Sequence, residues 1–314
     1  MTDDVQIEVT LPQGDSDAPR RIKRPGSSLV AFTSSKDRSL DLVAPSPGWN
    51  LAGRPVVYLL IQPTHDATRP IVYVGETEHL EQRLLKHRRT KNWSEIIVFS
   101  QEDLFDKACC RYLEYRAHWK INHTDRAELL NSKAPELSLL ERGRRGPAET
   151  TLKAMGLLLS FIKYPLFERL SDIERRQRHA ANSGPQFFTP GRRDVPTFEL
   201  APAGARGSAT GGPGGIAGDF VVYAPSEVAS SEQANCSEKT AFLRWMLENE
   251  SVLQRTDSSL SFTTNHAFAS QELAREFVLG GPNGPKWTSA NTGQTVEAWL
   301  NANPHPNRPS DDGN

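Results

Sequence analysis

Two short runs of β-branched and aromatic residues, separated by a loop rich in turn formers, constrain the fold of this chain more than any other feature. The first run is residues 56–61, Val-Val-Tyr-Leu-Leu-Ile, and the second is residues 71–75, Ile-Val-Tyr-Val-Gly. Val, Ile and Tyr favour strands, whereas the prolines and polar residues of 62–70 favour a turn. The pattern therefore predicts an antiparallel hairpin.

The segment after the hairpin changes from a strand pattern to a helix pattern. Leu80 and Leu84 recur at helical spacing, which predicts a short helix with Thr77 as its N-cap. Residues 96–99, Ile-Ile-Val-Phe, predict a third strand, and a longer helix follows and ends near residues 118–121. The order β-β-α-β-α predicts an α+β fold, with a small three-stranded antiparallel sheet and flanking helices.

The hairpin is followed by polar residues of the kinds that a metal-assisted phosphodiesterase needs. Residues 56–131 resemble the GIY-YIG nuclease domain, with Val-Val-Tyr at 56–58 in place of Gly-Ile-Tyr and Tyr-Val-Gly at 73–75 in place of Tyr-Ile-Gly. Two features depart from that pattern: Val56 replaces the first glycine, and the loop between the tyrosines is longer than usual. The resemblance implies a catalytic set of six residues, namely Tyr58, Tyr73, Arg83, His87, Glu114 and Asn131.

Glu114 and Arg83 are expected to meet the substrate phosphate. Glu114 is the candidate metal ligand, because one carboxylate bound to Mg²⁺ or Mn²⁺ leaves positions open for water and for a phosphate oxygen. Arg83 would contact the scissile phosphate, because the planar guanidinium matches the geometry of a phosphate. Judged by position alone, each is as well explained as an exposed residue on a helix.

The remaining members of the set have more than one interpretation. Tyr58 and Tyr73 are predicted to project from the same face of the hairpin; Tyr58 or His87 would help to deprotonate water, and Tyr73 would position the reactants. His87 lies one turn after Arg83, and it is otherwise an ordinary surface or packing residue. Asn131 is expected to hold the hairpin or a loop through hydrogen bonds.

A run of basic residues without an acidic one lies on the predicted first helix. It is expected to contact nucleic-acid phosphates, and it includes Lys86, Arg88, Arg89 and Lys91. Since the whole chain carries 37 Lys plus Arg against 38 Asp plus Glu, only such a local patch argues for a nucleic-acid partner. DNA is the expected substrate, and RNA remains an alternative. A second alternative is a catalytically degenerate GIY-YIG fold that binds DNA or protein without cleaving it.

The 314 residues are enough for two modest domains. Residues 147–170 predict a further helix that packs on the hairpin core. Residues 196–302 resemble, mainly through packing residues, an uncharacterised α+β domain often fused behind GIY-YIG nucleases. The predicted organisation is a β-rich N-terminal extension at 1–48, a GIY-YIG-like domain at 49–178, mostly flexible linker or loop at 179–218, a C-terminal α+β domain at 219–303 and a disordered tail at 304–314.

The cysteines and the apolar runs predict a cytoplasmic protein without a membrane partner. Cys109, Cys110 and Cys236 lack the spacing of a zinc or redox motif, so they are expected to be reduced thiols. The most apolar run, residues 154–162, is about half of the ~20 residues that a membrane span needs. Nothing in the sequence predicts an oligomeric state.

Overall fold

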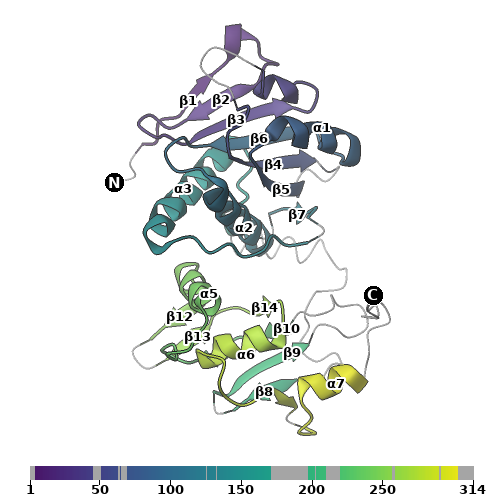
Figure 1. The fold of residues 1–314 in the computed structure, drawn as a ribbon, viewed down its shortest axis with the longest axis vertical. Helices are drawn as coiled ribbons and strands as arrows, with labels where there is room; N and C mark the ends of the chain where they lie inside the picture. Colours follow the sequence, from purple (N-terminus) through teal and green to yellow (C-terminus); the bar gives the residue numbers. More distant parts are fainter. Residues whose placement is uncertain are drawn as a thin grey trace. The chain divides into compact units, whose positions relative to one another are not determined.

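The computed structural model describes residues 4–44, 51–62, 64, 69–124, 126–131, 133–170, 197–201, 203–209, 220–256, 259–289 and 291–302. The chain divides into two compact units, Met1–Ser183 and Gly184–Asn314. The described parts of both are mixed α/β structures (Figure 1). No described helix is long and apolar enough to cross a bilayer.

The first unit is built on a seven-stranded sheet with the order β1-β2-β3-β6-β4-β5-β7. Neighbouring strands run antiparallel, apart from the parallel pair β5 and β7. The strands are β1 (Glu8–Thr10), β2 (Arg20–Lys23), β3 (Val30–Ser35), β4 (Val56–Gln62), β5 (Ile71–Thr77), β6 (Glu95–Ser100) and β7 (Glu128–Leu129).

The predicted hairpin is confirmed as β4 and β5, but the prediction of a three-stranded antiparallel sheet is wrong. Strand β3 pairs with β6 from Val30 to Ser35, so the strands of the N-terminal extension continue the same sheet. Strand β2 was not predicted, because Arg-Arg-Ile-Lys has only one apolar residue and so no alternation to detect. Strand β7 is only two residues long, which is too short for a pattern.

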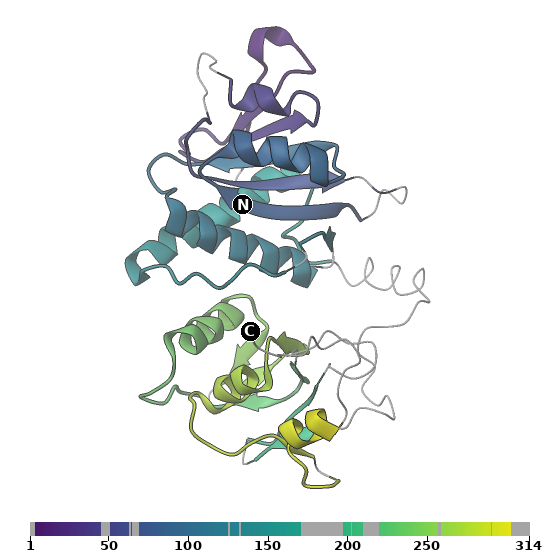
Figure 2. The same cartoon turned by 45° about the vertical axis from the view of Figure 1, so that its right-hand side comes forward.

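Helices cover both faces of this sheet, as Figures 1 and 2 show. Val56, Tyr58 and Leu60 belong to one buried cluster with Leu80 and Leu84 of α1. The alternate residues of β4 point to the opposite face, where α2 contacts β4 and β5 and α3 contacts α2. Because both faces are covered, β4 is apolar at consecutive positions. The helices are α1 (Leu80–Thr90), α2 (Lys107–Thr124) and α3 (Arg142–Phe161), with short 3₁₀ helices at Pro12–Gly14 and Ser39–Leu42.

Two predicted helix boundaries need correction. Thr77 is the last residue of β5 and not the N-cap of α1, although its Oγ1 accepts a hydrogen bond from the backbone N of His79 at 3.0 Å. The helix predicted at 147–170 is observed as α3, which begins at Arg142 and ends at Phe161, both earlier than predicted, and which contains Pro147. Proline is typical of the first turn of a helix, yet α3 begins at Arg142, before Pro147.

The second unit contains a five-stranded sheet, β14-β10-β9-β8-β15, and a three-stranded sheet, β11-β13-β12. Every pair of neighbouring strands is antiparallel. The strands are β8 (Phe198–Leu200), β9 (Ala205–Ala209), β10 (Phe220–Val222), β11 (Glu227–Val228), β12 (Leu253–Arg255), β13 (Leu260–Phe262), β14 (His266–Phe268) and β15 (Thr288–Ser289). The helices are α5 (Glu238–Asn249), α6 (Gln271–Leu279) and α7 (Val296–Ala302).

Strands β8 and β9 lie inside residues 179–218, which were predicted to be mostly linker or loop. Strand β8 has only three residues, and β9, Ala-Arg-Gly-Ser-Ala, is rich in small residues that do not indicate a strand. Gly207 of β9 lies against the ring of Phe220, and a Cβ there would be 2.5 Å from Cε1 of that ring. The rest of the predicted linker falls largely outside the described residues, and the predicted tail 304–314 lies entirely outside them.

Candidate functional site

Tyr58 of β4 occupies a buried position that depends on the residue opposite. In the β4–β5 register Tyr58 pairs with Gly75, and a Cβ at Gly75 would lie 2.5 Å from both Cζ and the hydroxyl oxygen of Tyr58. Only glycine leaves room for the phenol to lie across β5. The phenol reaches Nε2 of His87 at 2.9 Å, and Tyr58 is 1% exposed.

His87 is the buried member of α1 that closes this contact. It is 3% exposed, and its Nδ1 has no hydrogen-bond partner among the described residues. Burial is the main cause that lowers the pKa of His87 to about 4, and the nearby charges of Lys91, Arg83 and Lys86 lower it further. The imidazole is therefore neutral at pH 7.

Tyr73 of β5 completes a cluster of three rings. The centroids of Tyr58 and Tyr73 are 6.1 Å apart, and those of Tyr73 and His87 are 5.1 Å apart. The two tyrosines thus lie on the same face, as strand alternation predicts. Tyr73 is only half-buried, and the ammonium of Lys91 lies 4.2 Å from its ring centroid. Burial is the largest cause that raises the pKa of both tyrosines, so both phenols are protonated at neutral pH.

Asn131 forms hydrogen bonds with the backbone of β5 next to Tyr73. Its Oδ1 accepts a hydrogen bond from the backbone N of Val74 at 3.0 Å, and its Nδ2 donates to the Val74 carbonyl at 2.9 Å. Strand β7 pairs with only two residues of β5, and beyond that pairing the amide side chain of Asn131 bonds the backbone N–H and C=O at the edge of β5 as a neighbouring strand would. These two hydrogen bonds tie Asn131 to β5 of the hairpin.

Glu114 is a half-buried carboxylate on α2. Burial raises its pKa to about 7, Glu76 raises it further, and the cations Lys107, Arg83 and Arg111 oppose the rise. Arg83 is exposed on α1, and its charge also lowers the pKa of both Tyr58 and Tyr73. Charges on two helices therefore act on the same ring cluster.

The predicted set divides into residues in contact and residues linked by charge. Tyr58, Tyr73 and His87 touch one another, whereas Arg83 and Glu114 act on them electrostatically. The described residues include no group of three or more His, Cys, Asp or Glu side chains that could hold a metal, so a metal here would depend on few protein ligands. In the basic run Lys91 lies over Tyr73, Arg88 is half-buried, and Lys86 and Arg89 are exposed.

Glu76 was not predicted as part of the site. Its carboxylate is held by Lys107, whose Nζ lies 2.7 Å from each oxygen. The only signal in the sequence is strand alternation, which places Glu76 on the opposite face from Tyr73 and Gly75, toward α2. The three cysteines form no disulfide: Cys109 and Cys110 are buried, and Cys236 is partly buried.

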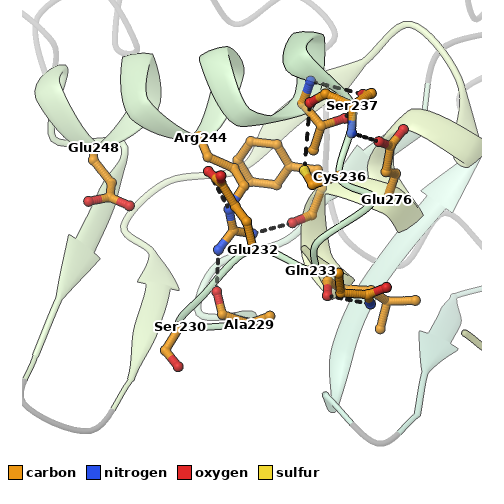
Figure 3. A network of polar contacts seen from close by, with 12 residues as sticks. Ala229, Ser230, Glu232, Gln233, Cys236, Ser237, Arg244, Glu248 and Glu276 are labelled. Atoms are coloured by element: carbon orange, nitrogen blue, oxygen red, sulfur yellow. Dashed lines mark hydrogen bonds and ion pairs between the residues drawn. The ribbon is translucent and has the colours of Figure 1, made fainter. Parts of the chain in front are cut away.

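The second unit has a polar network that stabilises its own fold (Figure 3). Arg244 of α5 is 2% exposed, and its guanidinium donates hydrogen bonds to the carbonyl oxygens of Phe277 and Ala229. Glu232 lies 3.9 Å from its Nε. These contacts join α5, the loop before it and the end of α6, so the buried arginine serves packing.

Comparison with known families gives a match within the second unit. The family described as a domain of unknown function (DUF4357) matches residues 203–300, within the range where the sequence predicted an uncharacterised α+β domain. No curated protein and no solved structure matches the chain. The resemblance of residues 56–131 to GIY-YIG nucleases stays a prediction.

Proposed function

We propose that the first unit is a metal-dependent nuclease of the GIY-YIG type that hydrolyses phosphodiester bonds of DNA. The observation that carries the proposal is the ring cluster of Tyr58, Tyr73 and His87, with Glu114 and Arg83 in electrostatic reach of it. A buried polar cluster with shifted pKa values beside charged groups is typical of a catalytic site. The basic run on α1 adds positive charge for an anionic substrate.

A divalent metal fits the chemistry of Glu114. Burial and the neighbouring Glu76 raise its pKa to about 7, and a bound cation would favour the charged form of this carboxylate. Glu114 would hold Mg²⁺ or Mn²⁺, and such an ion, when bound, polarises the phosphate and acidifies water. Arg83 would place its guanidinium on the phosphate oxygens, where negative charge grows in the transition state.

The three rings divide the remaining work by exposure. Tyr73 is the tyrosine open to solvent, so it is the phenol that would orient the attacking water. Tyr58 is buried, with 1% of its surface exposed, which argues against the hypothesis that Tyr58 itself deprotonates water. In the proposed site the hydroxyl of Tyr58 contacts Nε2 of His87, and the lowered pKa of His87 makes the imidazole a poor proton acceptor at neutral pH, so Tyr58 and His87 would position Tyr73.

The test is nicking of supercoiled plasmid with Mg²⁺, with Mn²⁺ and with EDTA. Glu114→Gln and Arg83→Ala should each lower the rate by roughly 10²–10³-fold, because each removes an interaction strongest in the transition state. Glu136→Gln, which changes an exposed glutamate of the same unit, is the control and should keep full activity. Equal rates for all variants would indicate a contaminant and refute the proposal.

Two further outcomes separate the alternatives. DNA binding by the wild type without metal-dependent cleavage would identify a binding module with a degenerate site. Faster cleavage of single-stranded RNA than of matched DNA would show that RNA is the substrate, with the same residues forming the site. Mapping the cut ends on single-stranded, duplex and branched DNA then defines the preferred structure.

A further inference from the structure

An ion-pair cluster joins β5 to α2 next to the proposed site. The side chain of Glu76 is 10% exposed, and Lys107 contacts both of its oxygens at 2.7 Å. Nε of Arg111 lies 3.9 Å from Oε1 of the same carboxylate. One carboxylate therefore faces two cations, and the closer one already balances its charge.

Arg111 is the cation in this cluster that can meet a ligand. Its side chain is 60% exposed, against 40% for Lys107. A separation of 3.9 Å is longer than a hydrogen bond, so Glu76 attracts the guanidinium without occupying its donors.

The position of Arg111 on α2 relates it to the candidate metal ligand. Arg111 precedes Glu114 by three residues, so the two side chains lie on the same face of the helix. The charges of Arg111 and of Arg83, which belongs to α1, both act on Glu114. Arg111 on the same helix and Arg83 on α1 are thus among the cations whose charge acts on Glu114.

We infer that Arg111 is a second phosphate-binding residue, which contacts a backbone phosphate next to the scissile one, while Arg83 serves the scissile phosphate itself. This inference rests on the proposed function and extends it. The ligand is the phosphodiester backbone of a nucleic-acid strand, whose successive phosphates offer one anion to each of the two guanidiniums. Glu76 attracts Arg111 from 3.9 Å, while Lys107 holds the carboxylate of Glu76 in place.

The experiment measures binding of a short fluorescent DNA duplex in Ca²⁺ at several salt concentrations. Arg111→Ala should weaken the affinity roughly tenfold and make the slope of log K against log salt shallower by about 0.9. Arg111→Lys should keep the slope, because it keeps the charge. In cleavage assays with Mg²⁺, KM of Arg111→Ala should rise by more than kcat falls.

The control is Arg24→Ala, which removes one exposed positive charge of the same unit far along the chain from the site. If Arg111→Ala matches this control in affinity and in slope while the wild type cleaves DNA, Arg111 contacts no phosphate and this inference is wrong. If the wild type neither binds nor cleaves, the proposed function fails and the inference fails with it. Thermal denaturation of both variants verifies that each remains folded.

Discussion

Substitution of Gly75 by alanine tests the central packing claim for the ring cluster. The added Cβ would lie 2.5 Å from Cζ and from the hydroxyl oxygen of Tyr58 and 2.9 Å from its Cε1. The ring has little room to move away, because its hydroxyl already contacts His87 and the residue is 1% exposed. One of the two strands, or the ring itself, must therefore shift.

The cost can be worked from these contacts. Overpacking of a buried site costs about 1–3 kcal/mol, and loss of the hydrogen bond between Tyr58 and His87 adds about 1 kcal/mol. The free energy of unfolding of the first unit should therefore fall by about 2–4 kcal/mol, which corresponds to a Tm lower by roughly 5–15 °C. The proposed nuclease activity should fall as well, since the cluster loses its geometry.

The assay is urea denaturation of the full chain, followed by hydrogen exchange in the peptides that cover β4 and β5. A double-mutant cycle identifies the cause. Tyr58→Phe keeps the clashing Cζ and should not relieve Gly75→Ala, whereas Tyr58→Val removes the ring and should relieve most of the cost. Gly143→Ala in α3, where a Cβ meets open space, is the control and should be neutral or stabilising by up to about 1 kcal/mol. Wild-type stability of Gly75→Ala, or no relief by Tyr58→Val, would refute the reasoning.

Three other changes have expected outcomes. Asn131→Ala leaves the N–H and C=O of Val74 without their side-chain partner. The change should lower the free energy of unfolding by about 2 kcal/mol and speed hydrogen exchange in β5, and unchanged exchange would show that these two hydrogen bonds do not stabilise β5. Arg116→Met leaves the carboxylate of Glu149 without the guanidinium whose Nε lies 2.6 Å from it. Urea denaturation should show that the free energy of unfolding falls by about 3–5 kcal/mol, and a second change, Glu149→Leu, should restore most of it. The folded pKa of His87 is about 4, below its ordinary 6.5, so at this residue only the unfolded chain gains a proton as the pH falls from 6.5 to 4. The free energy of unfolding should therefore fall by up to about 3 kcal/mol in that pH range, and it should fall by less in His87→Gln.

Local patterns predicted the hairpin well because its strands carry their information within a few residues. The run Val56–Ile61 is apolar and β-branched, and a turn-rich loop follows it, so no distant residue is needed to identify it. The continuation of the sheet is different. It depends on pairing between β3 and β6, whose partner residues are at least sixty positions apart, from Ser35 with Glu95 to Val30 with Ser100, and no local pattern encodes such a partner.

The site divides in the same way. Strand alternation is enough to place Tyr58 and Tyr73 on one face. The contact between Tyr58 and His87 requires the position of α1 over the sheet, which is set by packing of Leu80 and Leu84 and not by sequence spacing. The role of Glu76 was hidden for the same reason, since only the docking of α2 brings Lys107 to it.

Burial also separates residues that build the site from residues that would meet a substrate. Tyr58, Gly75 and His87 are enclosed, so changes to them should first lower stability and affect the proposed chemistry through lost geometry. Arg83 and Arg111 are exposed, so changes to them should leave stability near that of the wild type and alter interaction with an anionic strand. A stability measurement made beside each activity assay thus distinguishes the two groups. If an exposed arginine proves as destabilising as Gly75→Ala, then the guanidinium is part of the fold, and the assignment of phosphate binding to it is wrong.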